Sequence, residues 1–260
     1  MKPYFDYELN ILKEIHELSP SSCCAISDNE KSKNYRKALK IIDHILDEKT
    51  FGNWKDNSKS KLPPDFINEE ESLIMEVMRV DDHSFDGKKN PVLARERQMM
   101  RKARDFLEQM PNGVRFIVNA VTDLPTDEDH NYKFYYLSFQ RALRKHLSKL
   151  ETYKKNFPNK KVIFLVFDET SGVYLETYDR KGNQVLANLH IPFFDNRFLN
   201  EFIDSDLDYL MWYIPYNHYN SNGNHLTLPR LILIDIKNAR KGDILQRFDY
   251  DEKRMISNEK

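Results

Sequence analysis

Residues 61–82 read Lys-Leu-Pro-Pro-Asp-Phe-Ile-Asn-Glu-Glu-Glu-Ser-Leu-Ile-Met-Glu-Val-Met-Arg-Val-Asp-Asp. The polar run Asn68 to Glu71 separates Phe66 and Ile67 from a longer, mostly apolar segment, Leu73 to Val80. Two such segments joined by a polar turn are the pattern of a β-hairpin. The rest of the first half is interpreted outward from this hairpin.

Two acidic residues lie on the predicted hairpin. Side chains alternate between the two faces of a strand, so Glu76 lies in an otherwise apolar row. If Ile67 pairs with Ser72, Asp65 becomes the diagonal neighbour of Glu76 on the same face, roughly 7–8 Å away at Cα. A slip by one residue sends Asp65 to the other face. In the alternative interpretation, Asp65 is only a turn residue and Glu76 faces solvent.

Composition limits the class of protein. The chain has 260 residues, 40% of them hydrophobic, and a net charge of −1, so it can bury a core and its total charge indicates no partner. The only cysteines, Cys23 and Cys24, are adjacent and cannot link distant segments. No unbroken apolar run approaches eighteen residues. We therefore expect a soluble cytoplasmic protein with no membrane-spanning segment.

Hydrophobic periodicity predicts an α/β protein with a mixed central β-sheet flanked by helices. The apolar run Val162 to Phe167 is typical of a central strand buried on both faces. A polar stretch, 123–132, separates two halves, 1–122 and 132–260, which are two domains or parts of a single one. Helices are predicted over 9–18, 32–48, 91–109, 137–157 and 196–210. Strands are predicted over 64–67, 73–80, 114–121, 162–167, 173–178, 184–190 and 231–237, and an aromatic loop over 212–225.

The sequence around the two acids resembles a known family. Pro64-Asp65, ten further residues and then Glu76-Val-Met78 resembles the motif of the PD-(D/E)XK nuclease superfamily. The resemblance covers about residues 30–121 and implies a restriction-endonuclease-like core with αβββαβ order, followed by an α/β C-terminal half; the first strand of that core is not found in the sequence. It also implies that Asp65 and Glu76 hold Mg²⁺, a hard cation that prefers oxygen ligands.

The sequence departs from this motif at one position. Met78 stands where the family has a lysine that orients or polarises the attacking water, and a thioether carries no charge. Arg79 is adjacent but points to the other face of the strand. The family tolerates migration of the basic residue, so the candidates for its role are Arg79, Lys88, Lys89, Arg95 and Gln98.

Basic side chains gather on two predicted helices. A cationic helix face can neutralise phosphates and release their counterions, so these residues are candidates for binding DNA or RNA. The candidates are Arg141, Arg144, Lys145, Lys149, Arg97 and Arg101. In the alternative interpretation they form solvated helix faces, and the chain is a non-catalytic interaction or regulatory protein that binds nucleic acid or a protein partner.

Acids at the ends of later strands are weaker candidates. Asp235-Ile-Lys237 follows an apolar run, and Asp168-Glu169 follows the predicted central strand, with Glu176 on the next strand. Strand ends are frequent ligand sites in α/β proteins, but Asp is also a common turn former. The sequence contains no paired zinc-ligand motif, no glycine-rich phosphate loop and no nucleophile elbow.

Overall fold

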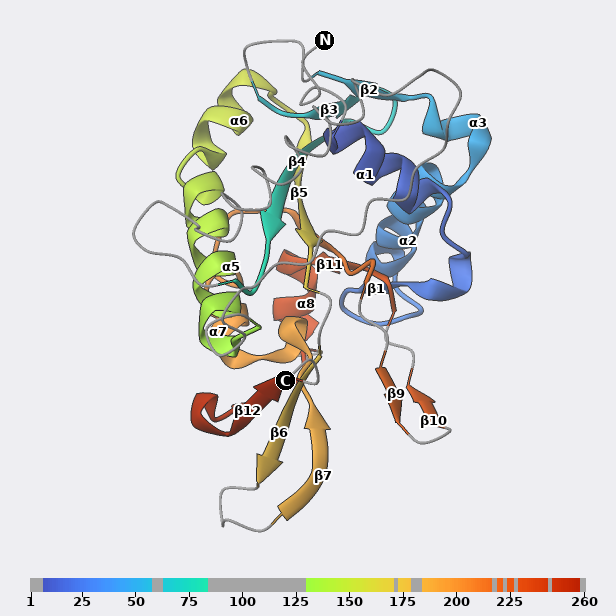
Figure 1. Ribbon diagram of the computed structural model, residues 1–260. Helices are drawn as coiled ribbons and strands as arrows, with labels where there is room; N and C mark the ends of the chain where they lie inside the picture. The colour runs from blue at the N-terminus through green and yellow to red at the C-terminus, as the bar shows by residue number, and fades with distance from the viewer. Residues whose placement is uncertain are drawn as a thin grey trace, which may run out of the picture.

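The computed structural model of the chain is shown in Figure 1. It describes residues 7–57, 63–83, 130–170, 173–178, 184–216, 219–221, 224–226, 229–242 and 245–257. The α-helices are α1 (Tyr7–His16), α2 (Lys33–Leu46), α3 (Glu48–Phe51), α5 (Tyr132–Leu147), α6 (Leu150–Asn156), α7 (Asn196–Leu199) and α8 (Ile236–Gly242). Short 3₁₀ turns are η1 (Pro20–Ser22), η2 (Pro192–Phe194) and η3 (Glu252–Arg254).

The strands form three sheets. The main sheet has seven strands in the order β1-β11-β8-β5-β4-β3-β2, a second sheet pairs β9 with β10, and a third has the order β12-β6-β7. The strands are β1 (Cys23–Ile26), β2 (Trp54–Asp56), β3 (Phe66–Asn68), β4 (Leu73–Val80), β5 (Lys161–Asp168), β6 (Tyr174–Tyr178), β7 (Gln184–Leu189), β8 (Tyr209–Tyr213), β9 (Tyr219–Ser221), β10 (Asn224–Leu226), β11 (Leu231–Asp235) and β12 (Met255–Ser257).

The main sheet is mixed. The β4, β5 and β8 strands are parallel, β11 runs antiparallel to β8, and β3 runs antiparallel to both β4 and β2. Helices cover both faces, with α5 and α6 on one side and α1 and α2 on the other (Figure 1). The predicted α/β class with a mixed, helix-flanked central sheet is confirmed. Strands from both halves of the sequence enter this one sheet, while the division into domains stays a prediction.

Alternation along the strands sends side chains into two separate cores. In β5, Val162, Phe164 and Val166 pack toward α5 and α6, whereas Ile163 and Leu165 pack toward α1 and α2. All five are at most 1% exposed, as expected for a central strand covered on both faces. The predicted central strand is confirmed.

The hairpin forms as predicted, but in a different register. The residue opposite Ile67 is Ile74, not Ser72, and Asn68 pairs with Leu73. Residues 69–72 form the turn, closed by a bond from the backbone N–H of Ser72 to the carbonyl of Glu69 (3.3 Å). Ser72 has a φ of 54°, in the left-handed region that closes such loops. The predicted pairing of Ile67 with Ser72 is therefore wrong by two residues.

Two predictions in the second half are corrected. The helix predicted over 196–210 ends at Leu199, and Tyr209–Tyr213 is a fully buried strand of the main sheet. Trp212 lies inside this strand rather than in an aromatic loop, because the run from Tyr209 is continuously apolar or aromatic. The strand predicted over 231–237 ends at Asp235, where α8 begins.

Other elements are shorter or were not predicted. The helix predicted over 137–157 is two helices, α5 and α6, separated at residues 148–149. The edge strands β1 and β2 were not predicted, because three or four residues are too few for a clear alternation. The helix predicted over 91–109 and the strand predicted over 114–121 lie outside the described residues. Within the described part of the chain, no helix is long and apolar enough to cross a membrane.

Candidate functional site

The hairpin register brings the two predicted acids together. Phe66, the first residue of β3, pairs with Met75, so Asp65 lies just before the strand at the level of Glu76. The charge of Glu76 acts on Asp65, which places the two carboxylates near each other. Glu76 itself lies between Ile74 and Met78 on the face that α5 and α6 cover.

Asp65 is fixed by the end of its strand. Because β3 begins only at Phe66, Val77 of β4 lacks a strand partner there, and its backbone N–H donates to Asp65 Oδ2 (2.7 Å). The backbone N–H of Asn57 donates to the carbonyl of Asp65 (2.7 Å). Burial first, and the charge of Glu76 second, raise the pKa of Asp65 to about 7. An acid held opposite another acid is a frequent feature of catalytic and cation sites.

Glu76 is buried rather than turned to solvent. It is 8% exposed and lies between the apolar side chains of Ile74 and Met78 on its face of β4. Its Oε1 lies 3.2 Å from Nδ1 of His146 on α5. Its Oε2 is buried, and the hydroxyl of Tyr153 on α6 faces the carboxylate. The alternative in which Glu76 faces solvent is therefore wrong.

Two aromatic residues from the covering helices face this pair. His146 in the last turn of α5 and Tyr153 in α6 are both buried. Both rings make edge contacts with Phe164 of β5, at centroid distances of 5.9 Å and 6.2 Å. Phe164 is the β5 residue paired with Glu76, so the two rings lie above neighbouring strands. The pKa of Tyr153 is raised, first by burial and then by the charge of Glu76 and a hydrogen bond to its carboxylate.

The described residues show no preformed metal site. In the described ranges, no group of three or more His, Cys, Asp or Glu side chains could hold a metal ion. Mg²⁺ keeps several water ligands and is commonly bound by one or two carboxylates together with substrate phosphates. Asp65 and Glu76 are two such carboxylates, and Glu76 already faces His146 and Tyr153.

Arg79 does not reach the carboxylate pair. It is exposed on the opposite face of β4, where its guanidinium binds Glu169 at the end of β5 through Nε (2.7 Å) and Nη2. The prediction that it serves as the cation beside Asp65 and Glu76 finds no contact to support it. Lys88 lies outside the described residues.

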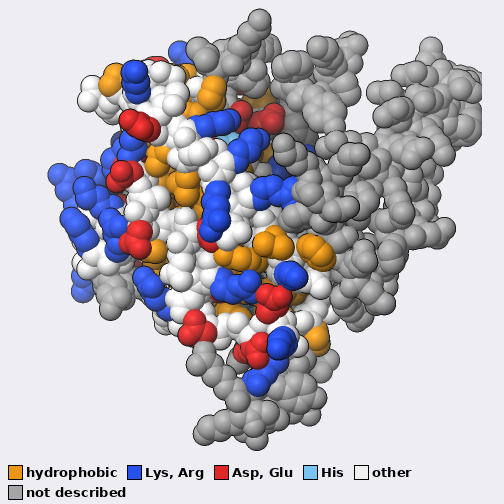
Figure 2. Space-filling view, turned by 90° about the vertical axis from the view of Figure 1, so that its left-hand side faces the viewer, with side chains coloured by type: hydrophobic (Ala, Val, Ile, Leu, Met, Phe, Trp, Pro, Cys, Tyr) orange, Lys and Arg blue, Asp and Glu red, His pale blue; other side chains and the backbone are white. Residues whose placement is uncertain are grey.

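Four of the predicted phosphate-binding residues lie on or next to α5. Arg141, Arg144, Lys145 and Lys149 are exposed, and Arg144 forms an ion pair with Glu201 (2.8 Å). Figure 2 shows the side of the molecule on which α5 and α6 lie, where Lys and Arg side chains are spread among acidic and apolar ones. Arg97 and Arg101 lie outside the described residues.

The later strand-end acids have structural partners. Asp168 is 1% exposed and accepts hydrogen bonds from the hydroxyls of Tyr135 and Thr170, the Thr170 N–H and Trp212 Nε1. Asp235 is 4% exposed and caps α8 by accepting from the backbone and side-chain amides of Asn238. Because these carboxylates are occupied by protein donors, they are poor cation ligands.

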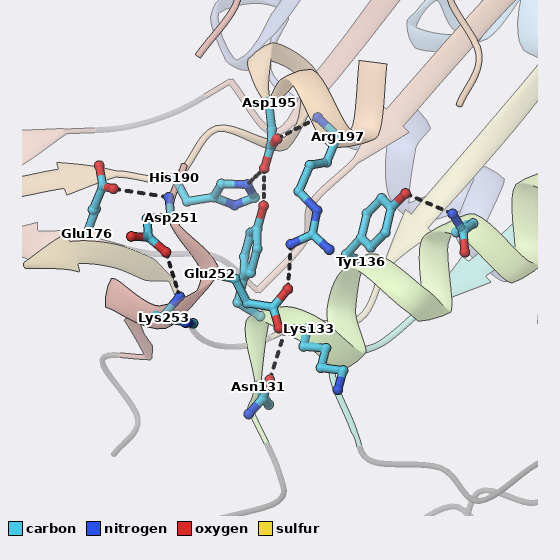
Figure 3. Close-up of polar contacts among 12 residues, drawn as sticks. Asn131, Lys133, Tyr136, Glu176, His190, Asp195, Arg197, Asp251, Glu252 and Lys253 are labelled. Atoms are coloured by element: carbon cyan, nitrogen blue, oxygen red, sulfur yellow. Dashed lines mark hydrogen bonds and ion pairs between the residues drawn. The ribbon is translucent and has the colours of Figure 1, made fainter. Parts of the chain in front are cut away.

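A buried polar cluster was missed by the sequence analysis. Asp195 Oδ2 accepts from the hydroxyl of Tyr132 and lies 2.8 Å from His190 Nε2, while Oδ1 accepts from the backbone N–H of Arg197. Figure 3 shows His190, Asp195 and Arg197 side by side, with Glu252 on the Arg197 guanidinium. The residues of this buried cluster are far apart in the sequence and match no motif. Each carboxylate oxygen of Asp195 has a donor, so this carboxylate holds the surrounding side chains in place.

His146 and Tyr153 lie on the buried faces of α5 and α6, among apolar side chains. In the sequence, the only indication of a site was that these two polar rings share a helix face with the apolar residues Phe139, Leu143 and Leu150. Only the tertiary structure places both rings over Glu76. Known relatives would give an independent indication of what this site does. No protein-family model, curated protein or solved structure matches the chain.

Proposed function

We propose that this protein acts on nucleic acid as a Mg²⁺-dependent phosphodiesterase, with Asp65 and Glu76 holding the cation. The observation that carries the proposal is the closeness of the two acids: Asp65 accepts from the backbone N–H of Val77, the residue after Glu76 (2.7 Å), and the pKa of Asp65 is raised first by burial and then by the charge of Glu76. When bound, Mg²⁺ would neutralise charge on the phosphate and lower the pKa of a bound water.

The order of the elements supports the same proposal. The sequence analysis lacked the first strand of an αβββαβ core, and β2 stands at that place in the chain. Asp65 then precedes the second strand of the predicted order, β3, and Glu76 lies in the third, β4. The predicted helix 91–109 and the predicted strand 114–121 that would complete this order lie outside the described residues.

The decisive test is cutting of nucleic acid by the full chain. We expect purified protein with Mg²⁺ to cleave DNA or RNA and to lose that activity with an excess of chelator, because the two carboxylates alone supply no electrophile. Linear and circular DNA, single-stranded DNA and single-stranded RNA would be incubated with protein and analysed on gels. Cleavage that is unaffected by chelator, or an absence of cleavage of all four, would contradict the proposal.

A non-catalytic nucleic-acid-binding protein is the second candidate, favoured by Met78. Its thioether lies in the apolar row beside Glu76, at the position where the motif has a cation. In this case the basic face of α5 would hold nucleic acid and the carboxylate pair would cut nothing. Both candidates require binding of nucleic acid, so the contribution of the basic face can be tested separately from cutting.

We expect a Lys145→Ala/Lys149→Ala double variant to bind nucleic acid more weakly. Both lysines are exposed and lie four residues apart. Loss of two phosphate contacts should lower the slope of log affinity against log salt by roughly 1.4–1.8. Fluorescence anisotropy at several salt concentrations would measure this slope.

The matched control for this experiment is Lys33→Ala/Lys37→Ala. These exposed lysines have the same spacing on α2, which covers the other face of the sheet. The control removes the same charge and should leave the salt slope unchanged. An equal loss in both double variants would mean that total charge, and not the α5 face, determines binding.

A further inference from the structure

We infer that α6 is a lid over Glu76, and that it moves away from the sheet before a phosphodiester reaches the two acids. This inference rests on the proposed function and concerns access to the same site. In the structure Glu76 is 8% exposed, and the rings of His146 and Tyr153 lie over it. A phosphate group cannot contact a carboxylate that is covered in this way. Cutting therefore requires a second, open arrangement of the covering helices.

The contact that closes the site comes from α6. Tyr153 is 1% exposed, and its hydroxyl faces the Glu76 carboxylate. Its pKa is raised first by burial, then by the charge of Glu76 and the hydrogen bond to it, and further by the charge of Asp65. This one tyrosine thus lies near both acids. Movement of α6 removes it from both, whereas His146, on α5, can stay beside Glu76 Oε1 (3.2 Å).

Few side chains hold α6 against the sheet. The helix has seven residues, of which Leu150 and Tyr153 are buried, whereas five side chains of α5 are buried. On the outer side, the Lys154 ammonium donates to the backbone carbonyl of Asp206, a bond at the surface. Segments with few buried apolar contacts open locally at a lower free energy than the whole protein. We therefore expect α6 to open while α5 stays in place.

The break between the two helices provides a hinge. Ser148 ends α5, and Lys149 is the N-cap of α6. A lysine side chain has only donors, so it cannot accept from the first N–H groups of the helix as a serine or aspartate cap does. Hinges are commonly a few residues at the ends of elements. The start of α6 is thus a place where the helix can turn away from the sheet.

The first test measures opening directly, without metal or nucleic acid. In a Cys23→Ser/Cys24→Ser background of the full chain, Leu150→Cys places a thiol under α6, and Leu143→Cys places one under α5 as the matched control. Both leucines are buried in the same core. Under native conditions a thiol reagent should label Leu150→Cys at least about tenfold faster than Leu143→Cys, because α6 opens without the rest of the protein.

The second test concerns the closing contact itself. Tyr153→Phe keeps the ring against Phe164 (6.2 Å) and removes the hydroxyl that faces Glu76. Loss of one hydrogen bond should shift the lid about fivefold toward the open form. Hydrogen exchange of the amides of 151–156 and Mg²⁺-dependent cutting should both become faster. Tyr136→Phe, which removes a hydroxyl that donates to Glu201 (2.7 Å), is the control and should change neither.

The outcomes separate the lid from the proposed function. If Leu150→Cys and Leu143→Cys are labelled equally fast, α6 does not open by itself and the inference is wrong, even where the wild type cuts. If Tyr153→Phe opens faster but cuts more slowly, the hydroxyl serves the chemistry and the lid does not limit access. If α6 opens by itself but neither the wild type nor Tyr153→Phe cuts nucleic acid, the proposed function is wrong.

Discussion

An Asp65→Asn variant is expected to lose Mg²⁺-dependent cutting and to become more stable than the wild type in the metal-free protein at pH 8. The loss of cutting should be at least about 10³-fold, because one of two anionic ligands disappears and several kcal/mol of transition-state stabilisation go with it. The gain in stability should be about 2 kcal/mol. The two effects have opposite signs because a buried carboxylate that binds a cation destabilises the folded protein when the cation is absent.

The sign of the stability effect follows from the raised pKa. Burial first and the charge of Glu76 second raise the pKa of Asp65 to about 7 from an ordinary value of 3.8, with smaller contributions from Glu8 and Asp56. The folded state thus holds the proton more tightly than the unfolded state. The contribution of Asp65 to stability is therefore fully present below about pH 4 and is lost as the pH rises toward 7. Three pKa units correspond to ~4 kcal/mol, and the remaining solvent contact of Asp65 reduces this to about 2 kcal/mol.

Asparagine keeps the structural contact of Asp65 while removing its charge. Its amide oxygen can still accept from the backbone N–H of Val77, the bond that fixes the end of β3. Urea unfolding with chelator at pH 5 and pH 8 would measure the difference between variant and wild type, which should widen by about 1–2 kcal/mol at the higher pH. Asp206→Asn, on an exposed turn, is the control and should show no such widening.

Two results would contradict the role assigned to Asp65. If Asp65→Asn is less stable than the wild type at both pH values, the carboxylate is a structural group that the fold requires in its charged form. If the variant is more stable but cuts like the wild type, Asp65 destabilises the fold and is not required for cutting. The Mg²⁺-induced stabilisation should also be lost in this variant, which links the two readouts to one site.

The sequence predicted the central strand and the hairpin because both have strong local signals. The apolar run Val162 to Phe167 can only be buried on two faces, and alternation placed Glu76 on the face of Ile74 and Met78. The register was predicted wrongly, because the closing residues of the turn carry no Gly or Asn and the left-handed Ser72 cannot be recognised from sequence.

The rest of the site was not predictable because its members come from different elements. His146 and Tyr153 lie on helices whose spacing indicates only an apolar stripe. Their position over Glu76 depends on how α5 and α6 cross the sheet. The helix predicted over 196–210 likewise overlaps the strand β8. A continuous apolar run such as Tyr209–Tyr213 is compatible with both helical and strand periodicity. Whether a short apolar run forms a helix or a strand depends on the segments that it packs against in the fold.

The largest loss of stability is expected from Asp195→Ala, at about 3–4 kcal/mol. Asp195 is 0% exposed and accepts hydrogen bonds from the Tyr132 hydroxyl and the Arg197 backbone N–H, with His190 Nε2 at 2.8 Å. Burial lowers the pKa of His190, so its neutral imidazole donates through Nε2 to the carboxylate. Removal of the carboxylate leaves buried donors without an acceptor, which costs more than the hydrogen bonds are worth.

Asp251→Ala is a matched control in the same neighbourhood (Figure 3). Asp251 also caps a helical turn, by accepting from the backbone N–H of Lys253 (3.1 Å), but it is partly exposed and holds no buried ring. Loss of such a cap costs about 1 kcal/mol. Urea unfolding of both variants therefore separates the capping contribution of Asp195 from its contribution to the buried cluster.

The comparison also distinguishes a structural cluster from a second active centre. A Tyr132→Phe variant removes one donor to Asp195 and should cost about 1 kcal/mol, because the carboxylate keeps its other partners. If the cluster is structural, Asp195→Ala and Tyr132→Phe should cut like the wild type at a temperature where each remains folded. If Asp195→Ala costs no more than Asp251→Ala but abolishes cutting, the His190–Asp195 pair must take part in the chemistry. The hairpin carboxylates would then not be sufficient for cutting.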